Sequence, residues 1–382
     1  MKIAVTDLLD GMRIDEDLVN MDGQLITTKN TLVTPALIEK LKQFNIKDIE
    51  AEATPEYWEL IKKRDFQFSQ NSEKPQVPEH KPTTVLEETI FDVRKTEAFS
   101  SFKDSCETNH KTLSSSFEDI MSDENNAQGL NLMEAMSDSL YKNNKNNINL
   151  IDMVYLMRNN ADSIYSHSLN VGMVAGQLGK WLKLPEEEVQ LLVTCGLFHD
   201  IGKLLIPKNI IDKPSALTDE EYIIMKTHAE KGYEFLSKFD HLDQVIKDVA
   251  LRHHERCDGS GYPNGLKDDE IDKFSKIIAI ADVYTAMTSD RIYRESICPF
   301  AVAAELEKEG LHKFDGHFVM TFLDNMLTSY LQKKVELNNG QVGVVLLLNR
   351  YQKSKPLVEL LNGETLDLAK NTDLYIARML DY

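Results

Sequence analysis

Histidines and acids that could bind a metal are concentrated in one part of this 382-residue chain. Six of the ten histidines lie between residues 167 and 254: His167, His199, His228, His241, His253 and His254. Two aspartates stand in apolar surroundings, Asp200 after residues 191–198 (LLVTCGLF) and Asp282 within residues 277–283 (IIAIADV). Burying an unpaired carboxylate is costly, so we expect both acids to be paired or metal-bound. Imidazole and carboxylate ligands suit Mn, Fe or Zn.

A single buried histidine is more often a packing residue with a hydrogen bond than a metal ligand. Six histidines together with two acids in apolar runs reverse that preference. Thr218 and Glu221 form a capping box that opens an amphipathic helix, and His228 is predicted on the buried face of that helix. His253 follows Val249 by four residues and is also predicted to face inward. His241 is interpreted as a surface residue and is left out of the site.

Two longer motifs identify a family. Residues 199–203 (HDIGK) resemble the HD signature of the HD superfamily of phosphohydrolases, and residues 253–263 (HHERCDGSGYP) resemble the HD-GYP signature. The resemblance extends from about His167 to Arg294. It implies a helical HD-GYP domain that hydrolyses cyclic di-GMP to pGpG and/or GMP.

The resemblance also implies a set of metal ligands. One divalent transition-metal ion would be held by His167, His199, Asp200 and Asp282. Asp200 would bridge to a second ion, held by His228, His253 and His254. Fe and Mn are the metals most consistent with these ligands.

Two ions bridged by a carboxylate suit phosphodiester hydrolysis. They can share a water molecule, lower its pKa toward neutrality and direct the bridging hydroxide in line at phosphorus. No protein nucleophile is then needed, and Asp200 and Lys203 are the predicted catalytic residues. Lys203 lies one turn after His199 and is expected to contact a phosphate or the attacking water.

Substrate contacts are predicted from the same resemblance. Gly261 and Tyr262 belong to a tight loop in which backbone can approach a ligand closely and the phenol can stack on it or hydrogen-bond to it. Arg291 and Arg294 match phosphate-binding positions of the family, and the guanidinium fork suits phosphate. Surface salt bridges are the alternative role for these arginines.

Two positions depart from the family pattern. Ser163 stands where some members carry a glutamate that holds a third metal, so two metals are expected. Thr285 stands where the family usually has an aspartate, which leaves catalytic efficiency and substrate choice open. The alternatives to a cyclic di-GMP phosphodiesterase are a weakly active or inactive module that binds a cyclic dinucleotide in signalling, and a phosphodiesterase for another cyclic dinucleotide such as cyclic GMP-AMP.

The predicted fold is mainly α, an HD-domain helical bundle with a small N-terminal α+β module and a short C-terminal β-rich cap. The expected parts are a module at 1–66 with a candidate regulatory role, a linker at 67–84, connecting helices at 85–149, the HD-GYP domain at 150–332 and the cap at 333–382. Asp22-Gly23, Asn339-Gly340 and Asn362-Gly363 predict hairpin turns, and a helix is predicted from Pro35 to Phe44.

An apolar stripe at helical spacing predicts a long helix: Phe99, Phe102, Cys106, Leu113, Phe117 and Ile120. Packing on its own domain is the favoured role for the stripe, and pairing with a second copy in a homodimer is the alternative. His110 beside it is interpreted as a hydrogen-bonded packing residue.

Net charge and cysteine content argue against other classes of function and of structural site. A net charge of -19 argues against binding to DNA, RNA or anionic membranes, because polyanions need clustered Lys and Arg. The four cysteines have no C-x-x-C spacing, so neither a zinc ribbon nor a disulfide framework is predicted. No signal segment or membrane span is recognisable, and a cytoplasmic location is expected.

Overall fold

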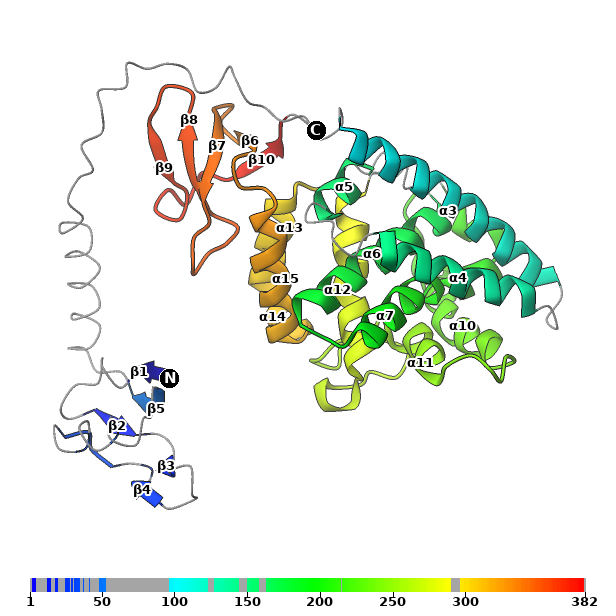
Figure 1. The fold of residues 1–382 in the computed structure, drawn as a ribbon, viewed down its shortest axis with the longest axis horizontal. Helices are drawn as coiled ribbons and strands as arrows, with labels where there is room; N and C mark the ends of the chain where they lie inside the picture. The colour runs from blue at the N-terminus through cyan, green and yellow to red at the C-terminus, as the bar shows by residue number, and fades with distance from the viewer. Residues whose placement is uncertain are drawn as a thin grey trace. The chain divides into compact units, whose positions relative to one another are not determined.

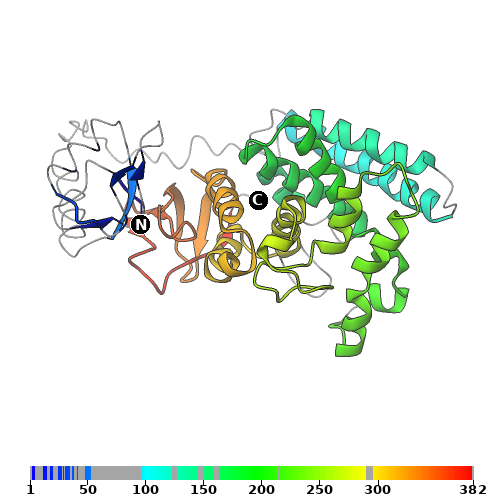
Figure 2. The same cartoon turned by 90° about the horizontal axis from the view of Figure 1, so that it is seen from below.

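The chain forms two compact units, residues 1–85 and 86–382, in the computed structural model drawn in Figures 1 and 2. The structure describes short pieces between residues 2 and 52, and then residues 96–122, 127–143, 150–157, 163–213, 215–289 and 296–380. None of the helices in these ranges combines the length and apolarity that a bilayer span would need. Each unit is described by itself.

The N-terminal unit contains short antiparallel strands. A three-stranded sheet has the order β1-β5-β2, and β3 pairs with β4. The bounds are β1 Lys2–Ala4, β2 Arg13–Ile14, β3 Leu18–Val19, β4 Leu25–Thr27 and β5 Asp48–Glu52. The β3–β4 pairing agrees with the predicted hairpin, whose turn at Asp22-Gly23 lies outside the described residues. Most of the predicted helix from Pro35 to Phe44 also lies outside them.

The second unit is mostly helical, which confirms the predicted fold class. Its helices up to the first HD-motif residue are α3 Glu97–Ser122, α4 Ala127–Asn143, α5 Leu150–Leu156, α6 Ile164–Trp181 and α7 Glu186–Phe198. Then follow the 3-10 helix η4 Ile201–Leu205, α8 Lys208–Ile211, α9 Asp219–Lys226, α10 His228–Leu236 and α11 Gln244–Arg252. The last group is η5 Asp268–Glu270, α12 Lys273–Thr288, α13 Pro299–Glu305, the π-helical turn η6 Leu306–Gly310, α14 Leu311–Lys313 and α15 Gly316–Thr328.

Helices α6 and α7 approach closely at a pair of glycines. A Cβ added to Gly196 would lie 2.4 Å from the Cα of Gly172, so only glycine allows this separation of the two backbones. A second close contact joins η4 to α10, where a Cβ on Gly202 would lie 2.0 Å from the carbonyl oxygen of His228. These contacts bring α6 close to α7, and η4 close to α10, around the residues of the HD motif.

The predicted long helix is α3, and its apolar stripe packs inside this unit against α4 and α6. Phe99, Phe102, Leu113, Phe117 and Ile120 are buried. His110 has the packing role expected of it: its Nε2 lies 3.0 Å from Ser163 Oγ and its ring meets Tyr165 edge-on.

A five-stranded antiparallel sheet closes the chain, in the order β10-β6-β7-β8-β9. Its strands are β6 Lys334–Leu337, β7 Val342–Leu347, β8 Leu357–Leu360, β9 Thr365–Asp367 and β10 Ile376–Met379. Gly340 and Gly363, both with φ of 82°, occupy the predicted hairpin turns. Both views show the sheet beside α13 and α15 and away from α10 (Figures 1 and 2).

The sheet shares one apolar core with the helices, to which Val335, Val345 and Val358 contribute. A polar contact fastens it as well: the ammonium of Lys333 donates to Asp152 Oδ2 at 3.1 Å, and Asp152 is only 1% exposed. The β-rich end is therefore built onto the helical body.

Candidate metal centre

The candidate ligands are contributed by the ends and middles of several helices. Ser163 caps α6, accepting a hydrogen bond from Ser166 N, and places His167 one turn into that helix. His199 is the C-cap residue that follows α7, and Asp200 is the N-cap residue that precedes η4. Asp282 lies in the middle of α12, which Asp272 caps.

The sequence interpretation of His228 was wrong in one respect. The capped helix, α9, ends at Lys226, and His228 is the first residue of the next helix, α10. The capping box itself is present, formed by Thr218 and Glu221. The chain bends at Thr227, and the imidazole is 1% exposed as predicted from its position.

Seven predicted ligands lie together in two groups. Within each group the possible ligand atoms all lie within 4.8 Å of one another, the groups being Asp200 with His228, His253 and His254, and His167 with His199 and Asp282. His241, which was left out, is exposed.

Asp200 joins the two groups through its two carboxylate oxygens. Its Oδ2 lies 3.2 Å from His199 Nε2 and 3.6 Å from His167 Nε2. Its Oδ1 lies 3.4 Å from His228 Nε2 and 3.7 Å from His253 Nε2. This is the arrangement that a bridging ligand requires.

Backbone carbonyl groups orient three of the imidazoles. The Nδ1–H of His199 donates to Gly196 O at 2.7 Å, that of His228 to Met225 O at 2.7 Å, and that of His253 to Ala250 O at 3.0 Å. A carbonyl oxygen can only accept, so each Nδ1 carries a proton, and each ring in its neutral form presents the lone pair of Nε2. Such outer hydrogen bonds are typical of metal-binding histidines.

The resulting lone pairs face one another without protons between them. His228 Nε2 and His253 Nε2 are 3.3 Å apart. Within the described part of the chain, the buried atoms His199 Nε2 and Asp200 Oδ1 have no hydrogen-bond partner. Buried lone pairs that lie close together repel one another unless a cation binds between them. This set of nitrogen and oxygen ligands therefore fits divalent metal ions.

Protonation states also suit metal binding. Burial lowers the pKa of His167, His253 and His254, and lowers that of His228 to about 3. Burial alone would raise the pKa of Asp200, but His199 and Lys203 outweigh it and the pKa falls well below its ordinary value. These four imidazoles are thus neutral and Asp200 is ionised, which are the forms that coordinate metals, whereas Asp200 raises the pKa of His199 against the effect of burial.

These shifts make the metal-free protein sensitive to acid. In the unfolded chain histidine gains a proton near pH 6.5, whereas folded His228 gains one only at about pH 3. The unfolded state therefore binds more protons between these values, and the free energy of unfolding should fall as the pH falls, by ~1.4 kcal/mol per pH unit for His228. The raised pKa of His199, caused by Asp200 against the effect of burial, acts in the opposite direction only above about pH 6.5, where the folded state binds the extra proton.

Urea denaturation of chelator-treated protein between about pH 7 and pH 5 measures that slope. His228→Leu should make it shallower, and His241→Asn, at an exposed position, should leave it unchanged. Stability that is constant or higher at pH 5 would contradict the expected burial of neutral histidines.

The cluster is closed on one side and open on the other. The side chains of His199 and His253 are 0% exposed, whereas those of His254 and Lys203 are 17% and 23% exposed. The Lys203 ammonium donates to Asp200 Oδ2 at 2.5 Å. A positive charge therefore lies at the accessible side, where an anion would arrive.

Tyr262, a predicted substrate contact, lies at this open side. Its ring stacks on His254, with centres 4.6 Å apart, and burial raises the pKa of the phenol. The phenol consequently stays protonated and can donate a hydrogen bond. Gly261 has a role within the loop: a Cβ there would lie 2.4 Å from the Cα of Glu255. Arg291 and Arg294 lie outside the described residues.

Sequence reasoning missed two residues at this side. Glu255 is 2% exposed and accepts hydrogen bonds from Asn264 N at 2.7 Å and Leu266 N at 2.9 Å, so it fixes the loop that carries Tyr262. Lys226 places its ammonium 5.7 Å from the centre of the Tyr262 ring. The only signal in the sequence was that each residue stands near a predicted ligand: Glu255 comes one residue after His254, and Lys226 comes two residues before His228.

The two hydrogen bonds that Glu255 accepts from the loop, here called the loop clamp, give a measurable expectation. Glu255→Gln replaces one acceptor oxygen with a donor that faces a backbone N–H, so we expect it to lower the free energy of unfolding by about 1–3 kcal/mol. Chemical denaturation checks this value. Glu270→Gln is the matched control, because Glu270 also accepts from a backbone N–H, that of Lys267, but at an exposed position. Equal effects of the two substitutions would contradict the clamp.

The two departures from the family pattern have distinct surroundings. Ser163 is the α6 cap and the partner of His110, so its hydroxyl is engaged at the helix start. Thr285 is 1% exposed, and no described residue hydrogen-bonds to its Oγ1.

Comparisons with known proteins agree with the motifs. Residues 145–318 match the family model described as HD domain. The chain is 35% identical over 182 residues to a cyclic di-GMP phosphodiesterase of Pseudomonas aeruginosa, covering 48% of this chain and 44% of that protein. It is 35% identical over 161 residues to a 3'3'-cGAMP-specific phosphodiesterase of Vibrio cholerae, covering 42% and 31%. The chain thus spans less than half the length of these relatives.

A solved structure shares the fold. An HDG"Y"P protein of Bdellovibrio bacteriovorus matches with a TM-score of 0.52 at 16% identity, over 85% of this chain and 98% of that one. The family match and the relatives confirm the predicted resemblance over residues 145–318, and the solved structure shows that the fold is shared.

Proposed function

We propose that the chain is a metal-dependent phosphodiesterase that hydrolyses cyclic di-GMP to pGpG and/or GMP. The observation that carries the proposal is the buried carboxylate of Asp200, whose two oxygens each face two imidazole nitrogens. The name of the Pseudomonas relative supports the substrate.

The proposed metal ligands follow the two groups. His167, His199, Asp200 and Asp282 would hold one divalent ion, and Asp200, His228, His253 and His254 a second, with Mn or Fe preferred by this donor set. When bound, such ions activate a water molecule and stabilise the charge that develops on phosphate oxygens.

The other residues act on the substrate. Lys203, at the open side, would donate to a phosphate oxygen once its ammonium leaves Asp200. Tyr262, held against His254 and kept protonated by burial, would donate from its hydroxyl or pack on a base. Lys226 beside Tyr262 adds positive charge on the same approach. Arg291 and Arg294 remain predicted phosphate contacts.

Two observations favour alternatives. The Vibrio relative named as cGAMP-specific supports cyclic GMP-AMP as a substrate for the same chemistry. Thr285, in place of the family's aspartate, supports a slow enzyme that chiefly binds the dinucleotide and signals.

Incubation of Mn- or Fe-loaded protein with cyclic di-GMP, cyclic GMP-AMP and cyclic di-AMP, followed by chromatography of the products, tests the proposal. We expect linear products from cyclic di-GMP and none after chelation. Cleavage of cyclic GMP-AMP alone would select the first alternative. Binding measured by calorimetry without any cleavage would select the second and reject the enzyme.

A further inference from the structure

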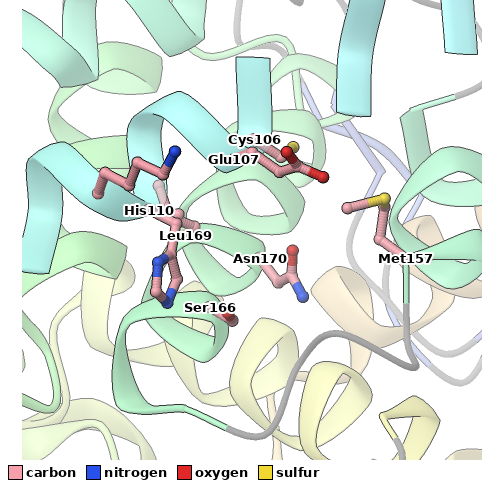
Figure 3. Close-up of a pocket in the computed structure, with 8 residues that line it drawn as sticks. Cys106, Glu107, His110, Met157, Ser166, Leu169 and Asn170 are labelled. Atoms are coloured by element: carbon pink, nitrogen blue, oxygen red, sulfur yellow. The ribbon is translucent and has the colours of Figure 1, made fainter. Parts of the chain in front are cut away.

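A pocket of about 360 Å³ lies between α3 and the first turns of α6. Its walls include Glu107, His110 and Lys111 from α3, Leu169 and Asn170 from α6, and Met157 (Figure 3). None of these residues belongs to the candidate metal centre. The volume falls within the range of small-molecule sites.

Asn170 is the unusual member of the lining. It is 7% exposed, and its side-chain amide makes no hydrogen bond with any described residue. Figure 3 shows the amide between α3 and Met157, directed into the pocket. The small exposed part of this side chain lets the amide reach solvent in the pocket, so its donors and its acceptor are available to a ligand carrying complementary groups.

The rest of the lining combines apolar walls with opposite charges. Met157 and Leu169 offer apolar surface for the faces of a flat ring. Glu107 and Lys111 are exposed and lie one helical turn apart on α3, so a carboxylate and an ammonium stand at the rim. His110 is held in place by Ser163 and acts as a fixed wall.

We propose that this pocket binds a guanine nucleotide. Guanine presents two adjacent N–H donors to a carboxylate, here Glu107, and its O6 and N7 accept from an amide, here Asn170. The base would lie between Met157 and Leu169, and the phosphate would meet Lys111 at the rim. Adenine lacks the adjacent donor pair and fits Glu107 less well.

Occupancy of the pocket would act on the metal centre through α6, which carries Asn170 and His167 three residues apart. Hydrolysis of cyclic di-GMP would also release a guanine nucleotide, so occupancy of the pocket would rise with the concentration of the reaction product. This regulatory role rests on the proposed function, whereas binding of the nucleotide does not.

Calorimetry of the full metal-free chain with GMP tests the binding. We expect one site per chain, at least about tenfold weaker affinity for AMP, and loss of binding in Asn170→Leu. That variant is close to isosteric and removes an unpartnered amide, so its thermal midpoint should stay equal or rise. A fall in the midpoint would mean that Asn170 has a structural role and would count against the site.

Lys111→Ala should weaken binding of GMP while leaving binding of guanosine unchanged, and Lys208→Ala, at an exposed position outside the pocket, should alter neither. Asp200→Asn should leave GMP binding intact even if it abolishes turnover, which separates this inference from the proposed function. Absence of GMP binding, equal affinity for AMP, or binding that survives Asn170→Leu would overturn it.

Discussion

Replacing Asp200 with asparagine should reduce hydrolysis of a cyclic dinucleotide by well over ~100-fold and lower the metal content of the purified protein. Loss of an outer partner of a metal ligand already costs about 10–100-fold in affinity or activity. Asp200 is the residue whose oxygens face both groups of imidazoles. An amide is neutral and offers only one acceptor oxygen, so both groups should lose affinity for cations.

Elemental analysis gives the metal content per chain, and product chromatography gives the rate. Asp240→Asn is the matched control, since Asp240 is exposed and outside the cluster. Circular dichroism must show that the asparagine variant is folded. A folded variant that keeps both its metal and its turnover would refute the bridging role.

Gly202→Ala is expected to destabilise the protein by about 3 kcal/mol, at the upper end for overpacking. The new methyl group would lie 2.0 Å from His228 O and 2.6 Å from Gly232 N, and both neighbours are backbone atoms that cannot move aside singly. The strain would separate η4 from α10 and therefore Asp200 from His228. Denaturant unfolding measures the loss, and metal content should fall with it.

Gly316→Ala serves as the control, because a methyl group there meets only Leu311 Cδ2, at 3.8 Å. Gly316 lies in the first turn of α15, where alanine is no worse than glycine. If the two substitutions had the same effect, close packing of η4 on α10 would not be needed for stability.

Local patterns predicted the helical body, the capping box and the hairpins well. Turn glycines, apolar stripes and caps depend on neighbouring residues, as at Gly340, Gly363 and Thr218, and such signals are present in the sequence. The break between α9 and α10 was missed because the apolar residues keep their helical spacing across Thr227, whereas the helix itself is interrupted there.

The candidate ligands were predicted by motif and by burial of charge, both of which act within short segments. Their convergence depends on Gly172, Gly196 and Gly202, which permit close backbone contacts between segments distant in sequence. Glu255 and Lys226 could not be assigned in advance, because their roles arise from loop backbone and ring contacts that only the fold creates. The pocket beside Asn170 likewise results from the packing of α3 on α6.

The ion pair between Lys333 and the buried Asp152 bears on how the chain can be divided. A fragment that ended at Gln332 would leave the Asp152 carboxylate in an apolar interior without its counter-charge, a loss of several kcal/mol. It would also uncover the core shared with Val335, Val345 and Val358. Limited proteolysis should consequently fail to release the last fifty residues as a separate folded piece, and heat should melt sheet and helices in a single step.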